Sequence, residues 1–450
     1  MKVKNLLFIS MSAFFIQSCS NDDIVNEPEE PVTEEPTTEE PVESENSAPD
    51  AFELLTVENE GSDIELAPTL TWNAAVDTDG DDVTYKILLD TNTTPETVLG
   101  ENIEDTTFVL TTNLERNTTY YWMVVAIDAN GAETNSSSIF SFSTKGISLA
   151  EVALQENAAF SARRNHTITE FNGKLYLIGG EGDSNTFKDV WSSVNGKDWT
   201  LVAEELFGFF PKSNHTAIVF KEKLWVIGGG NSDVWSTSDG ETWTRNETSP
   251  GFGSREGHST VVYNDKLWVI GGTSVSDQKN DVWSSEDGLV WEQVAESTQF
   301  SPRADHTTVV FEDKMYLIGG MFIENFSSNF LNDIYTSTDG INWVEVDPTT
   351  IFGVRAEHTS VVFDNKIWII GGWQAVVNEM TFEQDVTTFA DAWYSENGID
   401  WVQISINEAY AARLGHATTL FENKIIVTGG LDLNASANSR TYLNDVWIIE

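Results

Sequence analysis

All six histidines of the chain lie in one repeated pattern whose residue types could do chemistry. Each histidine follows a cationic residue by three positions, and each cation follows an aromatic residue by three positions. Imidazole can act as a general base or bind a metal ion, and guanidinium groups hold carboxylates or phosphates. The aromatic residues are Phe160, Phe209, Phe252, Phe300, Phe352 and Tyr410, the cations are Arg163, Lys212, Arg255, Arg303, Arg355 and Arg413, and the histidines are His166, His215, His258, His306, His358 and His416.

The shared register of the histidines favours a structural role over catalysis. A catalytic histidine is expected to differ from its siblings, whereas all six come directly before an apolar stretch. As metal ligands they would be spread around a ring too wide for one ion. Three acids, Glu256, Asp305 and Glu357, stand between a cation and a histidine, and one of them could be the general base of an enzyme. None stands out from its repeat siblings, so we expect no catalytic residue, no metal and no cofactor.

The elements around each histidine repeat in the same order, at intervals of 43 to 58 residues. An apolar strand, a turn ending in Lys, an apolar strand ending in Gly-Gly and a strand similar to Asp-Val-Trp follow one another. The paired glycines lack the spacing and the following helix of a phosphate-binding loop, so we interpret them as places where the backbone passes close to a neighbouring unit. They are Gly179, Gly180, Gly228, Gly229, Gly271, Gly272, Gly319, Gly320, Gly371, Gly372, Gly429 and Gly430.

A turn with Asp-Gly or Asn-Gly at its centre comes before the last strand of five copies. The pair Asp287-Gly288 is of the kind that tolerates the left-handed backbone angles of a hairpin turn. Because Asn replaces Asp freely among the copies, we interpret the acid as a turn former rather than as a metal ligand or a general base. The last strand begins with a tryptophan at Trp199, Trp243, Trp291, Trp343 and Trp401.

These features together resemble the kelch repeat, in which each copy forms one four-stranded blade of a β-propeller. The resemblance implies an all-β fold with a six-bladed propeller, similar to that of galactose oxidase, over residues 147–450. The sixth copy ends without a fourth strand, and the stretch 147–154 stands unpaired before the first copy. We expect strand 147–154 to complete the sixth blade and close the ring, with Leu149 or a neighbour in place of the tryptophan.

Residues 48–144 alternate apolar and polar residues in short stretches separated by turn residues, which is typical of a β-sandwich. Leu114 and Tyr120 resemble the leucine and tyrosine-corner pair of fibronectin type III domains, so we expect such a domain here. The acidic stretch 77–82 could hold Ca²⁺, but its spacing does not match an EF-hand loop, and a solvated turn is the preferred interpretation.

A lipoprotein signal peptide is predicted at residues 1–19. A basic start and an apolar run too short to span a bilayer lead to Ile16-Gln17-Ser18-Cys19, which resembles the lipobox of bacterial lipoproteins. The resemblance implies a lipid on Cys19 that anchors the chain in a membrane. Ser20 at the next position, and the acids that follow it, are similar to the signals of outer-membrane lipoproteins displayed on the cell surface.

Residues 20–47 are rich in Glu, Pro and Thr and contain neither Lys nor Arg. Such a segment cannot bury a core and repels itself, so it is predicted to form a disordered, extended stalk. The whole chain carries a formal charge of −48, which argues against binding to nucleic acids. Cys19 is the only cysteine, which excludes an internal disulfide and the cysteine–tyrosine crosslink of galactose oxidase.

One face of the predicted propeller combines the loops between blades with the connections from second to third strands. These connections are longest in blades four, five and six. In kelch proteins the loop that carries the six cations often lines the ligand pocket, so these cations are candidate ligand-binding residues. In the alternative interpretation, each cation bonds the carbonyl groups of a neighbouring loop. Trp373, Phe382 and Tyr442 are aromatic candidates on the same face.

The order of anchor, stalk, sandwich and propeller favours a non-enzymatic binding lipoprotein of the cell envelope. Its expected partners are the membrane, through Cys19, and either a glycan or an envelope protein, with the chain itself a monomer. One alternative is a sugar-acting enzyme of the sialic acid mutarotase type, because that family also has six kelch blades. Another is a scaffold subunit of an outer-membrane complex. Fold alone does not decide among these.

Overall fold

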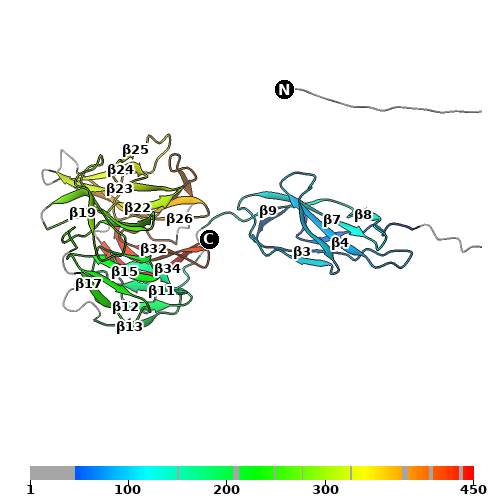
Figure 1. The fold of residues 1–450 in the computed structure, drawn as a ribbon, viewed down its shortest axis with the longest axis horizontal. Helices are drawn as coiled ribbons and strands as arrows, with labels where there is room; N and C mark the ends of the chain where they lie inside the picture. The colour runs from blue at the N-terminus through cyan, green and yellow to red at the C-terminus, as the bar shows by residue number, and fades with distance from the viewer. Residues whose placement is uncertain are drawn as a thin grey trace, which may run out of the picture. The chain divides into compact units, whose positions relative to one another are not determined.

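The computed structural model describes residues 46–148, 152–205, 212–247, 250–275, 277–324, 327–377, 384–404, 409–434 and 439–450. In these ranges the chain forms β-strands and turns (Figure 1), and no helix is long and apolar enough to cross a membrane. The predicted signal peptide with Cys19 and nearly all of the stalk lie outside the described residues, as do Leu149, Phe209 and Phe382.

The first nine strands form a β-sandwich of two sheets. One sheet has the order β1-β3-β6, and the other has the order β2-β9-β7-β4-β5, with β8 paired to β7. Trp72 of the first sheet packs edge-on against Tyr85 of the second, with ring centroids 5.4 Å apart. The strands are β1 (Leu54–Thr56), β2 (Gly61–Ile64), β3 (Thr69–Trp72), β4 (Thr84–Asp90), β5 (Val98–Ile103), β6 (Thr107–Val109), β7 (Thr119–Ile127), β8 (Glu133–Asn135) and β9 (Phe140–Thr144).

Strand β7 supplies the core of the sandwich. Tyr120, Trp122, Val124 and Ala126 are all buried, as their alternation in the sequence predicts. The Tyr120 hydroxyl accepts a hydrogen bond from the backbone N–H of Glu115 at 3.1 Å, which is the contact that characterises a tyrosine corner.

The remaining strands form a six-bladed β-propeller (Figure 1). The first strand of each blade lies beside the first strand of the next, and β32 lies beside β10, so the ring is closed. Blade one contains β10 (Thr167–Phe171), β11 (Lys174–Ile178), β12 (Val190–Ser193) and β13 (Thr200–Ala203), and blade two contains β14 (His215–Phe220), β15 (Lys223–Gly228), β16 (Val234–Thr237) and β17 (Thr244–Glu247). Blade three contains β18 (Ser259–Tyr263), β19 (Lys266–Thr273), β20 (Gln278–Ser285) and β21 (Glu292–Ala295).

Blades three to six extend as β-hairpins between their second and third strands. The extension adds two residue pairs in blade three and five pairs in each of blades four to six. Blade four contains β22 (Thr307–Phe311), β23 (Lys314–Glu324), β24 (Ser327–Ser337) and β25 (Val344–Glu345). Blade five contains β26 (Thr359–Phe363), β27 (Lys366–Ile370), β30 (Ala392–Ser395) and β31 (Val402–Ile404), with the separate hairpin β28 (Trp373–Val377) and β29 (Gln384–Thr388), and blade six contains β32 (Ala417–Phe421), β33 (Lys424–Asn434) and β34 (Ser439–Ile449).

The stretch before the first blade pairs with the open edge of β34. Ser148 and Glu450 exchange two backbone hydrogen bonds of 3.0 and 3.1 Å, and Gln155 and Val446 exchange two of 3.2 and 2.8 Å. The side chain of Leu154 packs against the cluster that contains Trp199. This pairing covers the edge of the last blade with irregular chain rather than with a continuous strand, as far as residues 148 and 152–155 describe it.

The paired glycines have two physical causes, of which the sequence analysis named only one. Both members have positive φ, which favours glycine; in blade one the angles are 57° at Gly179 and 96° at Gly180. A Cβ on Gly179 would lie 2.4 Å from the carbonyl oxygen of Lys212 in the next blade, and a Cβ on Gly180 would lie 2.8 Å from the Cβ of His166 in its own blade. The first glycine therefore makes room for the neighbouring blade and the second for the histidine.

The Asp-Gly turns are held by the acid acting on its own backbone. Asp287 Oδ1 accepts hydrogen bonds from the N–H groups of Leu289 and Val290, both at 2.8 Å. Asn397 Oδ1 does the same for the two corresponding N–H groups in blade five, at 2.8 and 2.9 Å. A carbonyl oxygen serves as well as a carboxylate here, which explains why Asn and Asp exchange among the copies.

The histidines join the blades in a closed belt. Each His Nε2 lies 2.9 to 3.1 Å from a hydroxyl of the preceding blade. In five cases this hydroxyl belongs to the first residue after the preceding histidine, which is Thr167, Thr216, Ser259, Thr307 or Thr359. Burial lowers the pKa of all six rings, so they are neutral at pH 7.

The sixth blade makes the same contact with a different residue. It has Ala417 where the others have a hydroxyl, and it has Thr428 where they have isoleucine. Thr428 Oγ1 lies 2.9 Å from His166 Nε2, so the belt is complete where the last blade meets the first.

We expect Thr428→Ile, which gives blade six the residue of its siblings, to lower the free energy of unfolding by about 1–3 kcal/mol, because a buried ring nitrogen loses its partner. Urea denaturation followed by tryptophan fluorescence measures this loss. The double variant Ala417→Thr/Thr428→Ile moves the hydroxyl to its usual place and should recover most of the stability. A double variant no more stable than the single one would contradict the belt.

Candidate functional site

The six candidate cations are buried inside the blades and do not face a ligand. The five arginine side chains are at most 1% exposed, and Lys212 is fully buried. Arg163 is typical: its Nη1 and Nη2 donate to the two carboxylate oxygens of Asp189 at 2.7 and 2.8 Å, and Nη1 also donates to the Gly179 carbonyl at 2.7 Å. The other pairs are Arg255–Asp281, Arg303–Asp333, Arg355–Asp391 and Arg413–Asp445.

Lys212 is the exception among the six. Its Nζ donates to the Gly228 carbonyl and to Asn231 Oδ1, both at 2.6 Å, and burial lowers its pKa to about 8. The aspartate of its blade, Asp233, pairs with Arg245 instead. The placement of all six cations corrects the ligand-binding role expected for them, because their donors are occupied inside the protein. The alternative interpretation, in which each cation bonds backbone carbonyl groups, agrees better with the structure, since each side chain does donate to a glycine carbonyl.

The carboxylate partners could have been found in the sequence. An aspartate stands two residues before the aromatic residue of the third strand in every copy, at Asp189, Asp233, Asp281, Asp333, Asp391 and Asp445. Six acids in one register with six cations indicate pairs within each repeat.

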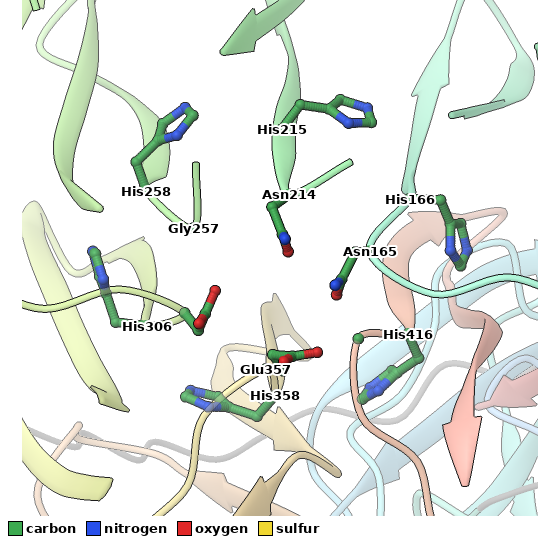
Figure 2. A pocket seen from close by; sticks show the side chains of 12 residues that line it. Asn165, His166, Asn214, His215, Gly257, His258, His306, Glu357, His358 and His416 are labelled. Atoms are coloured by element: carbon green, nitrogen blue, oxygen red, sulfur yellow. The ribbon is translucent and has the colours of Figure 1, made fainter. Parts of the chain in front are cut away.

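A closed ring of backbone hydrogen bonds forms the mouth of the central channel. It consists of the residue before each histidine, and each N–H donates to the carbonyl of the preceding member, with N···O distances of 2.6 to 3.1 Å. All six residues are left-handed, with φ between 49° and 61°. Figure 2 shows the Asn165, Asn214 and Glu357 side chains pointing toward the centre of this ring. The members are Asn165, Asn214, Gly257, Asp305, Glu357 and Gly415.

Asp305 and Glu357 are the two acids of this ring. Asn and Gly adopt left-handed angles readily, whereas a glutamate at this φ costs about 1–2 kcal/mol. The neighbours make room for the acids: a Cβ on Gly257 would lie 2.5 Å from Asp305 Oδ1, and a Cβ on Gly415 would lie 2.9 Å from Glu357 Oε2. The two acids therefore do stand out from their repeat siblings, contrary to the expectation from sequence.

The surroundings of these carboxyl groups favour their protonated form. Burial, reinforced by the charges of Glu357 and Glu256, raises the pKa of Asp305 to about 8. Burial also raises the pKa of Glu357, whose side chain is 13% exposed, although Arg164 opposes this rise. The mouth thus presents two acids with raised pKa values on adjacent blades, and Asp305 holds its proton at pH 7.

Arg164, the residue after the first buried cation, is the arginine that reaches the mouth. Its Nε and Nη2 lie 2.8 and 2.7 Å from Glu181 Oε1, and its Nη1 lies 3.5 Å from Glu357 Oε2. The side chain is 25% exposed, so its remaining donor capacity faces solvent. Sequence reasoning missed it because its siblings are Ser213, Glu256, Ala304, Ala356 and Leu414, so no register marked it.

Two of the aromatic candidates lie beside this group. Trp373 is half-buried, packs edge-on against Phe330 with centroids 4.9 Å apart, and favours the ionised form of Glu357. Its indole N–H makes no hydrogen bond of ordinary geometry to the described residues. Tyr442 is half-buried and close enough to Arg164 to act on its pKa. Phe382 lies outside the described residues.

The three extended hairpins of blades four to six stand side by side and form what we call the hairpin wall (residues 321–324 with 327–331, 373–377 with 384–388, and 431–434 with 439–443). Phe330 and Trp373 join the first two hairpins, and Thr388 Oγ1 donates to the Leu433 carbonyl at 3.4 Å between the second and third. The described parts of blades one and two contain no such extension. One side of the mouth is therefore walled and the other, near Arg164 and Glu181, is open.

Two cavities follow the propeller axis. The outer cavity, of about 140 Å³, is lined by the ring residues and the histidines (Figure 2). The inner cavity, of about 260 Å³, is lined mainly by hydroxyl side chains of the first strands, such as Thr167, Thr216, Ser259 and Thr307. Both are polar spaces in which a water or a sugar hydroxyl finds several partners.

Comparison with known proteins agrees with this architecture. Residues 165–372 match the family model described as the KLHDC2/KLHL20/DRC7 Kelch-repeats domain. The fold is similar to that of the solved structure titled "Structure of YjhT", with a TM-score of 0.52 and 17% sequence identity, over 65% of this chain and 96% of that one. The comparison with curated proteins gave no match. The second part of the chain is thus a kelch-type β-propeller, a fold that supports a binding or scaffold role.

We expect Arg303→Ala to lower the free energy of unfolding by about 3–5 kcal/mol, because Asp333 then keeps a largely buried, unpaired charge. Denaturant titration of the full chain measures the change. The matched control is Arg440→Ala, whose side chain is exposed, and its effect should stay within about 0.5 kcal/mol. An Arg303→Ala protein as stable as the control would contradict the structural role of the cations.

The raised pKa of Asp305 predicts how stability depends on pH. The unfolded chain releases this proton near the ordinary pKa of 3.8, but the folded chain keeps it up to about pH 8. The contribution of Asp305 is therefore fully present below about pH 4 and is lost as the pH rises through 8. Asp305→Asn restores the residue type found at positions 165 and 214 and should be more stable than the wild type at pH 9, with the difference shrinking toward pH 4. A difference that does not change with pH would disprove the shift.

Proposed function

We propose that this chain is a non-enzymatic binding lipoprotein of the cell envelope whose propeller binds a glycan at the channel mouth. The observation that carries the proposal is the group of Asp305, Glu357 and Arg164 beside Trp373. The six-fold repeat does not require any of these residues, since sibling positions have Gly, Asn, Ala or Leu. Residues that depart from the repeat and cost stability are expected where a ligand binds.

The residue types at the mouth suit a sugar. Carboxyl groups, the Asn165 and Asn214 amides and the Arg164 guanidinium can donate and accept in the directions that adjacent hydroxyl groups require. The half-buried indole of Trp373 offers an apolar surface for the ring of the sugar. Glu181, Glu256 and Glu357 outnumber Arg164 even when Asp305 holds its proton, so a neutral glycan fits the electrostatics better than an acidic one.

The hairpin wall supports the same proposal. A ligand that enters from the open side above blades one and two would lie across the mouth with one sugar edge over the outer cavity. A cavity of about 140 Å³ takes a hydroxymethyl group or part of one ring rather than a whole oligosaccharide. The glycan would therefore extend along the wall, and the wall would select its length and linkage.

The location proposed for this activity rests on the N-terminal sequence. A lipid on Cys19 would hold the protein in the outer membrane, and the acidic stalk of residues 20–47 would keep the propeller away from the surface. On the outside of the cell, the propeller would meet glycans as a monomer.

The test is an array of neutral and acidic glycans probed with the full-length chain in detergent. We expect selective binding to neutral glycans. Glu357→Gln should weaken it about tenfold through the loss of a carboxyl group that can bond the sugar hydroxyls, and Trp373→Ala should weaken it to a similar degree. The matched control Glu422→Gln changes an exposed glutamate in the turn between the first two strands of blade six and should bind as the wild type does. Binding that survives both mouth variants would move the site elsewhere, and no binding to any glycan would overturn the proposal.

One observation favours a second function, an enzyme of the sialic acid mutarotase type. Two carboxyl groups with raised pKa on adjacent blades could supply both the acid and the base for opening a sugar ring. The rate at which the α and β anomers of free sialic acid interconvert, followed by NMR, tests this directly. An acceleration by the wild type that Asp305→Asn and Glu357→Gln abolish would support the enzyme.

A third function, a scaffold subunit of an outer-membrane complex, is supported by exposed apolar side chains on the hairpins. Ile323 is 58% exposed and Val376 is 55% exposed. Crosslinking on intact cells would reveal a stable protein neighbour, and the loss of that neighbour on Ile323→Asp would place the contact on the hairpin wall.

A further inference from the structure

Three separate segments bring oxygen-bearing side chains together at one end of the sandwich. Asn46 precedes β1, the acidic stretch 77–82 connects β3 to β4, and Asp128 and Asn130 follow β7. Asn46 Nδ2 donates to Asp128 Oδ2 at 2.8 Å, and Asn130 Nδ2 donates to Asp81 Oδ2 and to Asn46 Oδ1, both at 2.7 Å. The backbone N–H of Ser47 donates to Asp79 Oδ2 at 2.6 Å.

Asp77, which is bonded to the backbone of Asp79 and Asp81 in the same loop, supplies a further observation. The residue is only 9% exposed, and its Oδ1 accepts from the N–H groups of Asp79 and Asp81 at 2.8 and 3.4 Å, so the carboxylate is turned into the loop. Its other oxygen, Oδ2, is buried and has no hydrogen-bond partner among the described residues. A buried carboxylate oxygen without a donor is costly, and a cation would satisfy it.

The negative charge of the group also favours a bound cation. Asp77, Asp79, Asp81, Asp82 and Asp128 lie in these short segments, and none of them forms an ion pair with a described Lys or Arg. The nearby Asp90 shows how this domain otherwise stabilises a turn acid: its two oxygens accept three backbone N–H groups, from Asn92, Glu96 and Thr97, at 2.6 to 3.1 Å. Asp77 accepts only two backbone N–H groups, both at Oδ1, and its Oδ2 accepts none.

We propose that Asp77, Asp79, Asp81, Asp128, Asn46 and Asn130 form a binding site for Ca²⁺. Among the described residues, no three His, Cys, Asp or Glu side chains already surround a common point at which a metal ion would be held. The amide N–H groups of Asn46 and Asn130 bridge the carboxylates in the place of a cation. Turning each amide by 180° exchanges its nitrogen for its oxygen and converts the two donors into ligands.

Ca²⁺ fits this set better than other metal ions do. It accepts six to eight oxygen ligands in irregular geometry, and the group offers four carboxylates and two amide oxygens from three flexible connections. Mg²⁺ requires a near-ideal octahedron and gives up its water reluctantly, and the absence of His and Cys from the group disfavours Zn²⁺. A bound ion would fix the end of the predicted stalk, at Asn46, to the body of the sandwich.

The test is isothermal titration of the full-length chain with CaCl₂ after removal of metal ions with EDTA. We expect one site per chain with a Kd on the order of 0.1–1 mM, as is usual for extracellular Ca²⁺ modules, and binding of Mg²⁺ at least about tenfold weaker. Asp77→Asn should abolish this site. Weak, unsaturated binding by the acidic stalk would remain in the variant and thus serves as an internal reference.

Two further variants keep the result decisive. Asp105→Asn removes an exposed acid elsewhere in the sandwich and should bind Ca²⁺ as the wild type does. If Asp77→Asn does not fold, as judged by circular dichroism, Asn130→Ala takes its place, because its exposed side chain is not part of the core. A wild type that binds no Ca²⁺ at 5 mM (about five times the weakest expected Kd), equal affinity for Mg²⁺, or an unchanged site in a folded variant would each overturn the proposal.

Discussion

The buried arginine–aspartate pair is the interaction on which the propeller depends. In each of five blades the arginine joins the loop that enters the blade to an aspartate before or within its third strand and to the carbonyl of the first paired glycine. These bonds fix the backbone of the residues that follow. The second residue after the arginine is the left-handed member of the ring at the mouth, and the third is the histidine of the belt. The bidentate geometry keeps the charge satisfied while water is excluded. The sequence makes these arginines candidates for binding a ligand. In the structure their positive charge instead fixes the backbone that presents other residues.

Repetition within one chain serves as an internal control. Where all six blades agree, as in the histidines and the paired glycines, packing explains the residue type. Where one or two blades differ and the difference is costly, packing does not explain it, and Asp305 and Glu357 are such cases. Thr428 is the opposite case. It replaces the isoleucine of the other blades, and its hydroxyl compensates for the one that Ala417 lacks in the same blade. Deviations from a repeat therefore separate into compensated ones, which are structural, and uncompensated ones, which are candidates for function.

The blades and the structural role of the histidines could be predicted, because they depend on periodic patterns and on residues in register. The role of Arg163 and its siblings could not be predicted from the cations alone, since a guanidinium suits a ligand and a buried carboxylate equally well. The six aspartates that recur in register with the cations indicate that the cations are paired within each blade. Asp305 and Glu357 do not stand out when they are grouped with Glu256, which occupies a different position in its repeat. They stand out when they are set beside Asn165, Asn214, Gly257 and Gly415. The Asn and Gly residues at these sibling positions already indicated left-handed backbone, where a glutamate is unusual.

The closure of the ring has a consequence for the order in which the chain folds. Ser148 and Gln155 pair with β34, and His166 takes its hydroxyl from Thr428, so the contacts that close the ring join the start of the propeller to its sixth blade, which is synthesised after the other five. During synthesis, the first five blades have an unpaired strand edge, and a histidine at one end lacks its hydroxyl partner, until the sixth blade is made. Contacts between such distant parts of a chain form slowly, since their loop-closure entropy is lost before the contacts form. Until the sixth blade has been synthesised, the propeller is an open arc, and a chaperone that shields the free edges of the arc would act at the seam between blades six and one.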